Sequence, residues 1–352
     1  MDGKRKRKAI YGRTRKEVAE QMKALLREQQ QGLPIAVERQ TIEQFLTRWL
    51  EEAARPAIRP RTYDSYAQVI RLYLAPALGH YQLAKLAPEH VQAMLNGLLA
   101  RGLSPRTVSY ARAVLRRALN QAVRWGRAAR NVATLTEPPR AKKPQITPLN
   151  PEQARTLLDT VRDTRDEALY RVALALGLRM GEILGLRWQD VNLDTGSLTV
   201  AVALQRRKGS RELVEPKTER SRRTLPLPPV LVRALRAHRA RQLAGRLAAG
   251  PHWQDWDLVF PSTVGTPMEP RNLTRQFKGV LAAASLPDVR FHDLRHSCAT
   301  FLLAQGVNPR VAMEILGHSQ ISLTLNTYSH VMPSSTRAAV DLVGSLLAGA
   351  GG

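Results

Sequence analysis

A cluster of prolines near the middle of the chain constrains its fold more than any other feature. Between Thr136 and Pro151 the sequence places five prolines among three basic residues: Pro138, Pro139, Pro144, Pro148 and Pro151. Proline lacks a backbone N–H and fixes its φ angle, so this stretch can form neither a helix nor a central strand. We therefore predict an extended linker over residues 135–149 that separates two folding units.

The charge of the chain indicates what it binds. Its 352 residues carry a net charge of +25, while hydrophobic residues make up 43%, close to the average of folded proteins. The basic residues therefore belong to folded domains, and a polyanion such as a nucleic acid is the expected partner. Charge alone leaves open a protein that is merely rich in arginine.

Several protein classes are excluded. The single cysteine, Cys298, excludes an internal disulfide framework and a zinc site built from cysteines. The longest apolar run, residues 172–178, is far shorter than the roughly 20 residues of a membrane span. The basic start of the chain has no apolar segment behind it, so it does not resemble a signal peptide. We expect a soluble, intracellular protein.

Residues 1–35 form a small basic module. We expect a short strand and turn over residues 9–12, and then a helix, because Thr14 and Glu17 have the spacing of a capping box. The candidate nucleic-acid contacts of this module are five consecutive basic residues: Lys4, Arg5, Lys6, Arg7 and Lys8.

Residues 38–134 are expected to be helical, and two of the expected helices begin with the same tripeptide. The sequence Pro-Arg-Thr occurs at residues 60–62 and 105–107, and proline suits the first turn of a helix. An arginine and a hydroxyl at a helix N-terminus can bind a phosphate, although ordinary helix capping would use the same residue types. The candidate DNA contacts here are Arg61, Thr62, Ser104, Arg106 and Thr107.

Residues 150–335 form the larger predicted domain, in which helical patterns surround one patch of strands. We expect strands over residues 197–204, 212–214 and 222–227. The sequence contains no glycine-rich phosphate loop, no dinucleotide-binding fingerprint and no acidic cluster able to hold magnesium. The expected fold class is mainly α with a small β-sheet (α+β).

One polar group in this domain is the pair formed by Arg179 and Glu182. Arg179 interrupts an apolar helical run, residues 172–186, and burying an arginine there is costly unless it is paired. Glu182 lies one helical turn later and can supply the partner charge. A purely structural ion pair is an equally good interpretation.

Two further polar groups follow. His292 and Arg295 share a face at the start of a helix. His292 and His296 do so too, but a metal site is a weak interpretation, because an arginine lies between them and no third ligand is evident. Gly317 is a plausible C-cap that leaves His318 at a helix end, and Tyr328 follows. Taken alone, Tyr328 would more often be a packing residue.

Together these residues resemble the active site of the tyrosine recombinase, or phage integrase, family. The resemblance covers about residues 40–335 and keeps the family's order of motifs: Arg179 in Gly-Leu-Arg-Met-Gly-Glu, Lys217 on a hairpin, His292 and Arg295 in His-Asp-Leu-Arg, His318 in Leu-Gly-His, then Tyr328. Residues 38–134 resemble the family's helical, SAM-like core-binding domain, and residues 1–35 the end of an arm-binding domain. That N-terminal domain normally has a three-stranded sheet, whereas this chain has room for about one strand.

The resemblance implies DNA strand exchange through a 3′-phosphotyrosyl intermediate, catalysed by residues 150–335. Tyr328 would be the nucleophile. Arg179 and Arg295 would hold the phosphate, since a guanidinium stays charged and can bind two oxygens at once. Lys217 would be the general acid for the leaving 5′-hydroxyl.

The remaining roles follow from the same resemblance. His292 would accept the proton of Tyr328, and His318 would donate a hydrogen bond to the phosphate. Glu182 would orient Arg179. With this many cations around the phosphate, no metal ion or other cofactor is required.

The resemblance also implies partners. Exchange of four strands needs four protomers, so we expect a homotetramer on DNA attachment sites, a monomer when free, and two domains that form a clamp around DNA. Residues 336–352 carry an apolar stripe that could dock on a neighbouring protomer or pack on its own domain. A DNA-bending host factor or an excisionase is a further expected partner, a membrane is not, and the location is the bacterial cytoplasm, at the nucleoid.

The leading interpretation is a site-specific recombinase that integrates or excises a mobile element such as a prophage. Alternatives are a recombinase of the same family that resolves chromosome or plasmid dimers, a more distant type IB topoisomerase, and a DNA-binding regulator that has lost catalysis.

Overall fold

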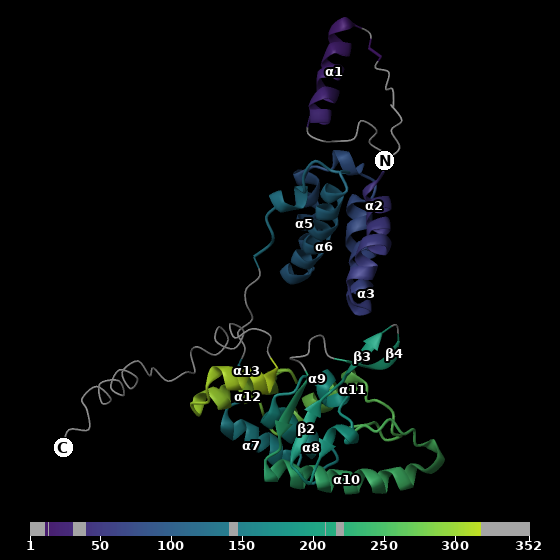
Figure 1. The fold of residues 1–352 in the computed structure, drawn as a ribbon. Coiled ribbons are helices and arrows are strands. Elements are labelled where there is room, and N and C mark those ends of the chain that lie inside the picture. The colour runs from purple at the N-terminus through teal and green to yellow at the C-terminus, as the bar shows by residue number, and fades with distance from the viewer. Residues whose placement is uncertain are drawn as a thin grey trace, which may run out of the picture. The chain divides into compact units, whose positions relative to one another are not determined.

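The computed structural model describes residues 11–12, 14–30, 40–140, 147–207, 209–215 and 222–317 (Figure 1). The chain divides into two compact units, residues 1–144 and 145–352, and the boundary lies within the proline-rich stretch. Each unit has a hydrophobic core of its own. None of the described helices combines the length and the hydropathy that a membrane crossing requires.

The described part of the first unit is built from helices. Helix α1 spans Arg15–Gln30, and Thr14 accepts a hydrogen bond from the backbone N–H of Glu17, as the capping-box spacing predicts. The other α-helices are α2 (Ile42–Trp49), α3 (Pro60–Val69), α4 (Ala75–Leu78), α5 (Pro88–Ala100) and α6 (Pro105–Arg124). Short π and 3-10 segments lie between or after them: η1 (Leu50–Ala54), η2 (Arg55–Ala57), η3 (Ile70–Leu74), η4 (Leu83–Lys85) and η5 (Val132–Leu135).

Helix α6 shows how the sequence specifies this core. Ser104 is its N-cap and accepts a hydrogen bond from the backbone N–H of Thr107 at 3.2 Å, so the predicted cap is confirmed. Apolar side chains recur along the helix every three or four residues and form one buried stripe: Val108, Ala111, Val114, Leu115, Ala118, Leu119 and Ala122. The remaining positions, including several arginines, face away from the core.

The described part of the second unit combines helices with two small antiparallel sheets. Its helices are α7 (Pro151–Thr160), α8 (Glu167–Leu176), α9 (Met180–Leu184), η6 (Trp188–Asp190), α10 (Pro229–Ala249), η8 (Gly250–His252), α11 (Pro270–Ala283), α12 (Asp293–Ala304) and α13 (Pro309–Leu316). Strands β1 (Val191–Asn192), β2 (Ser197–Val200) and β5 (Arg223–Pro226) form a sheet in the order β1-β2-β5. Strands β3 (Ala203–Arg207) and β4 (Ser210–Val214) form a hairpin. The expected α+β class is confirmed.

One predicted strand is wrong. The alternating segment 197–204 is divided between two sheets, because β2 ends at Val200 and β3 begins at Ala203. Leu198, Val200 and Leu204 are all buried, so the apolar alternation continues through the break and does not reveal it.

Helix α8 forms the centre of the second unit and packs against both α10 and α12. In Figure 1, α10 lies on the opposite side of this unit from α12 and α13. The start of the unit is tied to α12, since the fully buried Ser297 hydroxyl accepts a hydrogen bond from the backbone N–H of Leu149 at 2.9 Å. Asn150 then caps α7 through a capping box with Gln153, as its position before Pro151 predicts.

Candidate active site

The site begins at a sharp turn between α8 and α9. Gly177 has a left-handed backbone with φ of 57°, and a Cβ atom there would lie 2.5 Å from the side chain of Leu316. Both the φ angle and the packing therefore require glycine. The prediction of one continuous apolar helix through Arg179 is wrong, because the turn places Arg179 at the N-cap of α9.

Glu182 is a buried carboxylate at the centre of an ion cluster. Its Oε1 accepts a hydrogen bond from Arg179 Nη1 at 2.7 Å, and its Oε2 accepts from the Arg179 backbone N–H at 2.9 Å. Arg223, on β5, donates from Nη2 to the same Oε2 at 3.1 Å. Burial alone would raise the pKa of Glu182, but Arg223 and then Arg179 outweigh it and hold the pKa below its usual value.

The same two arginines bind the end of α13. Arg179 Nη2 donates to the Gly317 carbonyl oxygen at 2.8 Å, and Arg223 Nε donates to that of Ile315 at 2.8 Å. The last carbonyls of a helix lack partners within the helix and carry partial negative charge, so guanidiniums suit them. Gly317 has a left-handed φ of 65°, which confirms the predicted C-cap. The end of α13 is thus fixed one residue before His318.

Arg295 reaches the turn from a distant part of the chain. It lies in the first turn of α12, is only 3% exposed, and donates from Nη1 to the Gly177 carbonyl oxygen at 2.7 Å. The backbone that carries Arg179 is therefore bonded to Arg295. The two arginines predicted to hold a phosphate converge on one turn of the backbone.

His292 completes the described cluster. It is the N-cap of α12, and burial, followed by the positive charge of Arg295, lowers its pKa; Asp293 opposes this effect, and Arg179 adds to it. The ring of His296 lies edge-on to it at a centroid distance of 5.3 Å, and burial lowers the pKa of His296 to about 4. Within the described ranges no three side chains of the metal-binding types come together.

The β3–β4 hairpin packs directly on α9. A Cβ atom on Gly181 would lie 2.9 Å from the Leu204 carbonyl oxygen, and one on Gly185 would lie 2.7 Å from the Leu204 backbone nitrogen. These glycines let β3 approach the helix that follows Arg179. Lys217 follows β4 in the sequence and lies outside the described residues, as do His318 and Tyr328.

In the first unit the two Pro-Arg-Thr helix starts belong to neighbouring helices. The Ser65 and Tyr110 hydroxyls lie 3.0 Å apart, and Arg117 Nη1 donates to the Tyr66 hydroxyl at 3.1 Å, so α3 and α6 lie side by side. Arg61, Ser104 and Arg106 are exposed, while Thr62 and Thr107 are half-buried. Lys4, Arg5, Lys6, Arg7 and Lys8 lie outside the described residues.

Two family models match the chain. The model described as the phage integrase family matches residues 148–334, more than half of the chain, and that of the phage integrase N-terminal SAM-like domain matches residues 41–99. The chain belongs to the phage integrase family. It is therefore a site-specific recombinase of the tyrosine type.

Curated relatives extend over nearly the whole recombinase. A tyrosine recombinase XerC-like protein from Caldanaerobacter subterraneus subsp. tengcongensis is 31% identical, over 98% of this chain and 93% of its own length. An integrase from Saccharopolyspora erythraea is 28% identical, over 97% of this chain and 90% of its own length.

Solved structures share the fold. The Tn1549 transposon integrase, in complex with a circular intermediate DNA, has a TM-score of 0.74 at 21% identity, covering 86% of this chain and 99% of that one. A lambda integrase dimer bound to a core site has a TM-score of 0.59 at 18% identity, covering 82% of this chain and 95% of that one.

Sequence reasoning did not identify Arg223 as part of the site. The structure brings Arg179, Glu182, His292 and Arg295 of the recombinase together, and Arg223 joins Glu182 from β5. The sequence places Arg223 in a predicted strand, but the partners of Arg223, Glu182 and Ile315, lie 41 and 92 residues away in the sequence. No local motif marks such contacts.

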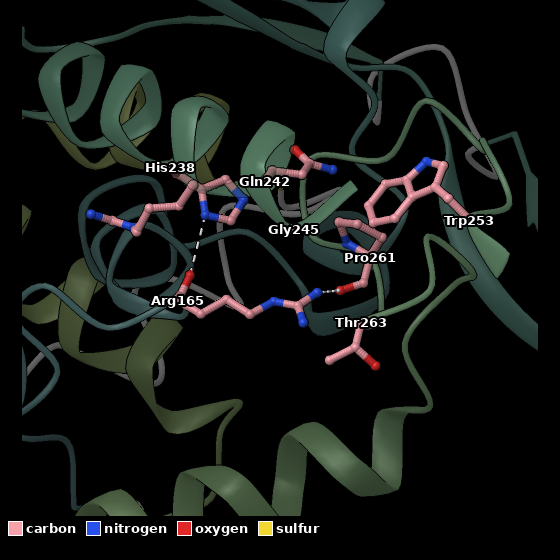
Figure 2. A pocket seen from close by; sticks show the side chains of 8 residues that line it. Arg165, His238, Gln242, Gly245, Trp253, Pro261 and Thr263 are labelled. Carbon is pink, nitrogen blue, oxygen red and sulfur yellow. Dashed lines mark hydrogen bonds between the residues drawn. The ribbon is translucent and has the colours of Figure 1, made fainter. Parts of the chain in front are cut away.

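A cavity of about 160 Å³ lies elsewhere in the same unit, beside α10 (Figure 2). Arg165 Nη2 donates to the Pro261 carbonyl oxygen at 2.6 Å, and the two ring nitrogens of His238 face the carbonyl oxygens of Arg165 and Val259. Burial lowers the pKa of His238, although both carbonyls oppose this effect. Among the predicted catalytic residues that the structure describes, Arg179, His292 and Arg295, none lines this cavity.

Proposed function

We propose that this recombinase integrates or excises a mobile element such as a prophage, by cleaving and rejoining DNA through a 3′-phosphotyrosyl intermediate on Tyr328. The observation that carries the proposal is the convergence of Arg179 and Arg295 on the Gly177 turn, with His292 beside them. Two guanidiniums held by different helices suit a phosphodiester whose transition state concentrates negative charge on its non-bridging oxygens.

The proposed step conserves the phosphodiester energy. The Tyr328 oxygen attacks phosphorus, the Tyr–O–P bond forms, and the bond from phosphorus to the 5′-oxygen breaks. Ionising a tyrosine of ordinary pKa at pH 7 costs about 4 kcal/mol, so a proton acceptor and nearby cations must help. Religation is the reverse attack by a 5′-hydroxyl, and it requires no ATP.

His292 suits the role of proton acceptor for Tyr328. Its lowered pKa keeps the imidazole neutral near pH 7, and only the neutral ring can take up a proton. Lys217 protonates the leaving 5′-oxygen, and His318 donates a hydrogen bond to the phosphate. Glu182 orients Arg179, and the bound charges make a metal ion unnecessary.

The proposed DNA contacts of residues 38–134 are the two adjacent helix starts. Arg61 with Thr62 at α3, and Ser104 with Arg106 and Thr107 at α6, place cations and hydroxyls at helix N-termini, where phosphates can bind. The basic run of residues 4–8 is a further proposed contact. The DNA complexes of the Tn1549 and lambda integrases support DNA as the partner.

The wider organisation is proposed on the same basis. Residues 1–35 would be a partial arm-binding module, 38–134 the core-binding domain, 135–149 the linker and 150–335 the catalytic domain, with a clamp around DNA. Four protomers would assemble on two DNA sites, with residues 336–352 docking in trans, in the bacterial cytoplasm at the nucleoid. An excisionase or DNA-bending host factor would set the direction.

A dimer-resolving role is the second candidate, because a relative at 31% identity is described as XerC-like. It uses the same residues and differs in the DNA acted upon. The sequence of the DNA that the protein cleaves distinguishes it: a site at the end of a mobile element supports integration, and a site in the chromosome's terminus region or on a plasmid supports dimer resolution.

The decisive experiment uses the full chain, expressed in cells that carry its neighbouring DNA. We expect protein–DNA adducts that resist SDS, and we expect Tyr328→Phe to abolish them while DNA binding persists. Sequencing the attached DNA identifies the site. Tight binding with no adduct from the wild-type chain would contradict the proposal and favour a regulator that has lost catalysis.

A further inference from the structure

Arg223 is the second of the two arginines that bond to Glu182, and no step of the proposed reaction uses it. We propose that Arg223 is a positioning residue for strand cleavage, which acts through Glu182 to hold Arg179 in the geometry that binds the scissile phosphate. This inference rests on the proposed function.

The described contacts of Arg223 are with the protein scaffold. Its side chain is 8% exposed, its Nη2 donates to Glu182 Oε2, and its Nε donates to the Ile315 carbonyl oxygen. The Arg179 side chain is 40% exposed and shares the same carboxylate. One carboxylate thus connects an arginine that is open to solvent with one that is enclosed.

Sharing the carboxylate sets how Arg179 is held. Glu182 is 6% exposed, and Arg223 is the first of the charges that keep its pKa low. Without Arg223, Arg179 becomes the principal cation beside the buried Glu182 carboxylate. The carboxylate then neutralises the charge of Arg179 and draws its guanidinium away from the phosphate and toward Glu182. With Arg223 present, Oε1 orients the Arg179 guanidinium while Oε2 is shared with a second cation.

The packing at the end of α13 fits the same role. Arg223 Nε and Arg179 Nη2 bind carbonyls two residues apart, and a Cβ atom on Gly317 would lie 2.7 Å from Arg223 Nη1. A side chain at Gly317 would therefore displace the Arg223 guanidinium. Strand β5, helix α9 and helix α13 meet at this one side chain.

The test is a double-mutant cycle of single-turnover cleavage, on half-site DNA recovered from the wild-type adducts. We expect Arg223→Met to slow cleavage about 100-fold, the loss typical of a small misplacement of a reacting group, with DNA affinity unchanged. Glu182→Gln should cost a similar factor. Because Arg223 acts through Glu182, the double variant should lose far less than the product of the two single losses.

The matched control is Arg187→Met. Arg187 is also partly buried in the second unit, and it pairs with Asp190 at 2.7 Å, outside the cluster. It should lose stability in a thermal melt but retain cleavage. A second substrate, with sulfur in place of the bridging 5′-oxygen, supplies a leaving group that needs no general acid. That substrate should rescue Lys217→Met and leave Arg223→Met slow.

Three results would overturn the inference. The first is wild-type cleavage by Arg223→Met. The second is fully multiplicative losses in the cycle, which would indicate that Arg223 contacts the phosphate directly, and the third is rescue of Arg223→Met by the sulfur substrate, which would show that the variant acts on Lys217. If Arg223→Met does not fold, Arg223→Lys replaces it. Lysine cannot bond both Glu182 and Ile315 in this geometry, so wild-type cleavage by that variant also contradicts the inference. Failure of the proposed function is distinct, since the wild-type chain would then form no adduct.

Discussion

The cluster arginines of the second unit and the candidate DNA-contact arginines of the first unit differ in how firmly the protein holds them. In the second unit, Arg295 is 3% exposed and donates to a backbone carbonyl, and Arg223 is bonded to both a carboxylate and a carbonyl. In the first unit, Arg61 and Arg106 are exposed at helix N-termini. Chemistry on a phosphate needs charges fixed before the substrate arrives, whereas binding to a DNA backbone tolerates charges that adjust.

The largest expected effect comes from loosening a fixed arginine. Arg295→Lys keeps the charge but loses the planar fork, so it cannot hold both the Gly177 carbonyl and a phosphate in the same geometry. We expect cleavage to fall about 100- to 1000-fold, as when one transition-state donor is removed, with DNA binding retained. Single-turnover adduct formation measures the first quantity and fluorescence anisotropy the second. Equal losses in both would remove the distinction between the two arginine classes.

Acidification should affect the cleavage proposed for the second unit and the DNA binding proposed for the first unit differently. Protonation of His292 removes the proposed acceptor, and because its pKa is lowered, the fall in cleavage should occur below about pH 6.5, the usual histidine value. Cleavage should then drop about tenfold per pH unit, while binding through arginines, which stay charged, should not weaken. Rate and affinity measured between pH 5 and 8 test this, and an acid limb above pH 6.5 would contradict it.

Thermal melts at each pH provide the control for that experiment. The pKa values of His292 and His296 are lowered in the folded state, that of His296 to about 4, so the unfolded chain binds more protons in acid. The free energy of unfolding therefore falls as the pH drops below about 6.5. Cleavage rates are compared only at those pH values at which the melt shows that the protein is folded.

The smallest expected effect comes from the exposed arginines. Arg61→Ala with Arg106→Ala should weaken DNA binding and reduce the slope of log affinity against log salt by roughly two, one for each phosphate that the protein no longer neutralises. The chemical step at saturating DNA should not change. The control pair is Arg48→Ala with Arg55→Ala, exposed arginines in salt bridges with Glu52 and Glu51. An equal change of slope in the control pair would show general electrostatics only.

The sequence predicted those parts of the site that depend on local order. Glu182 lies three residues after Arg179, and Gly317 follows the apolar stripe of α13, so both contacts could be predicted from spacing. The helix break at Gly177 was missed because the apolar pattern continues on both sides of it. Nothing in a hydrophobic period distinguishes a turn that is buried on every side from a helix.

Two arrangements that depend on distant segments were not predicted, for a different reason. Arg223 was recognisable only as a residue of a strand, and its role depends on carbonyls that α13 presents after folding. The division of segment 197–204 between two sheets likewise depends on how β3 packs on Gly181 and Gly185. Both features are determined by which distant residues lie next to each other in the folded chain. The order of residues in a single sequence does not give this information directly.

The ion cluster has a consequence for engineering. The partners described for Arg179, Arg223 and Arg295 all lie between Gly177 and Gly317, within one compact unit. Exchanging residues 40–140 for those of a relative would leave every one of these bonds in place. We therefore expect the ion cluster to survive such an exchange, so that the chimaera would test whether residues 40–140 set which DNA the recombinase cleaves.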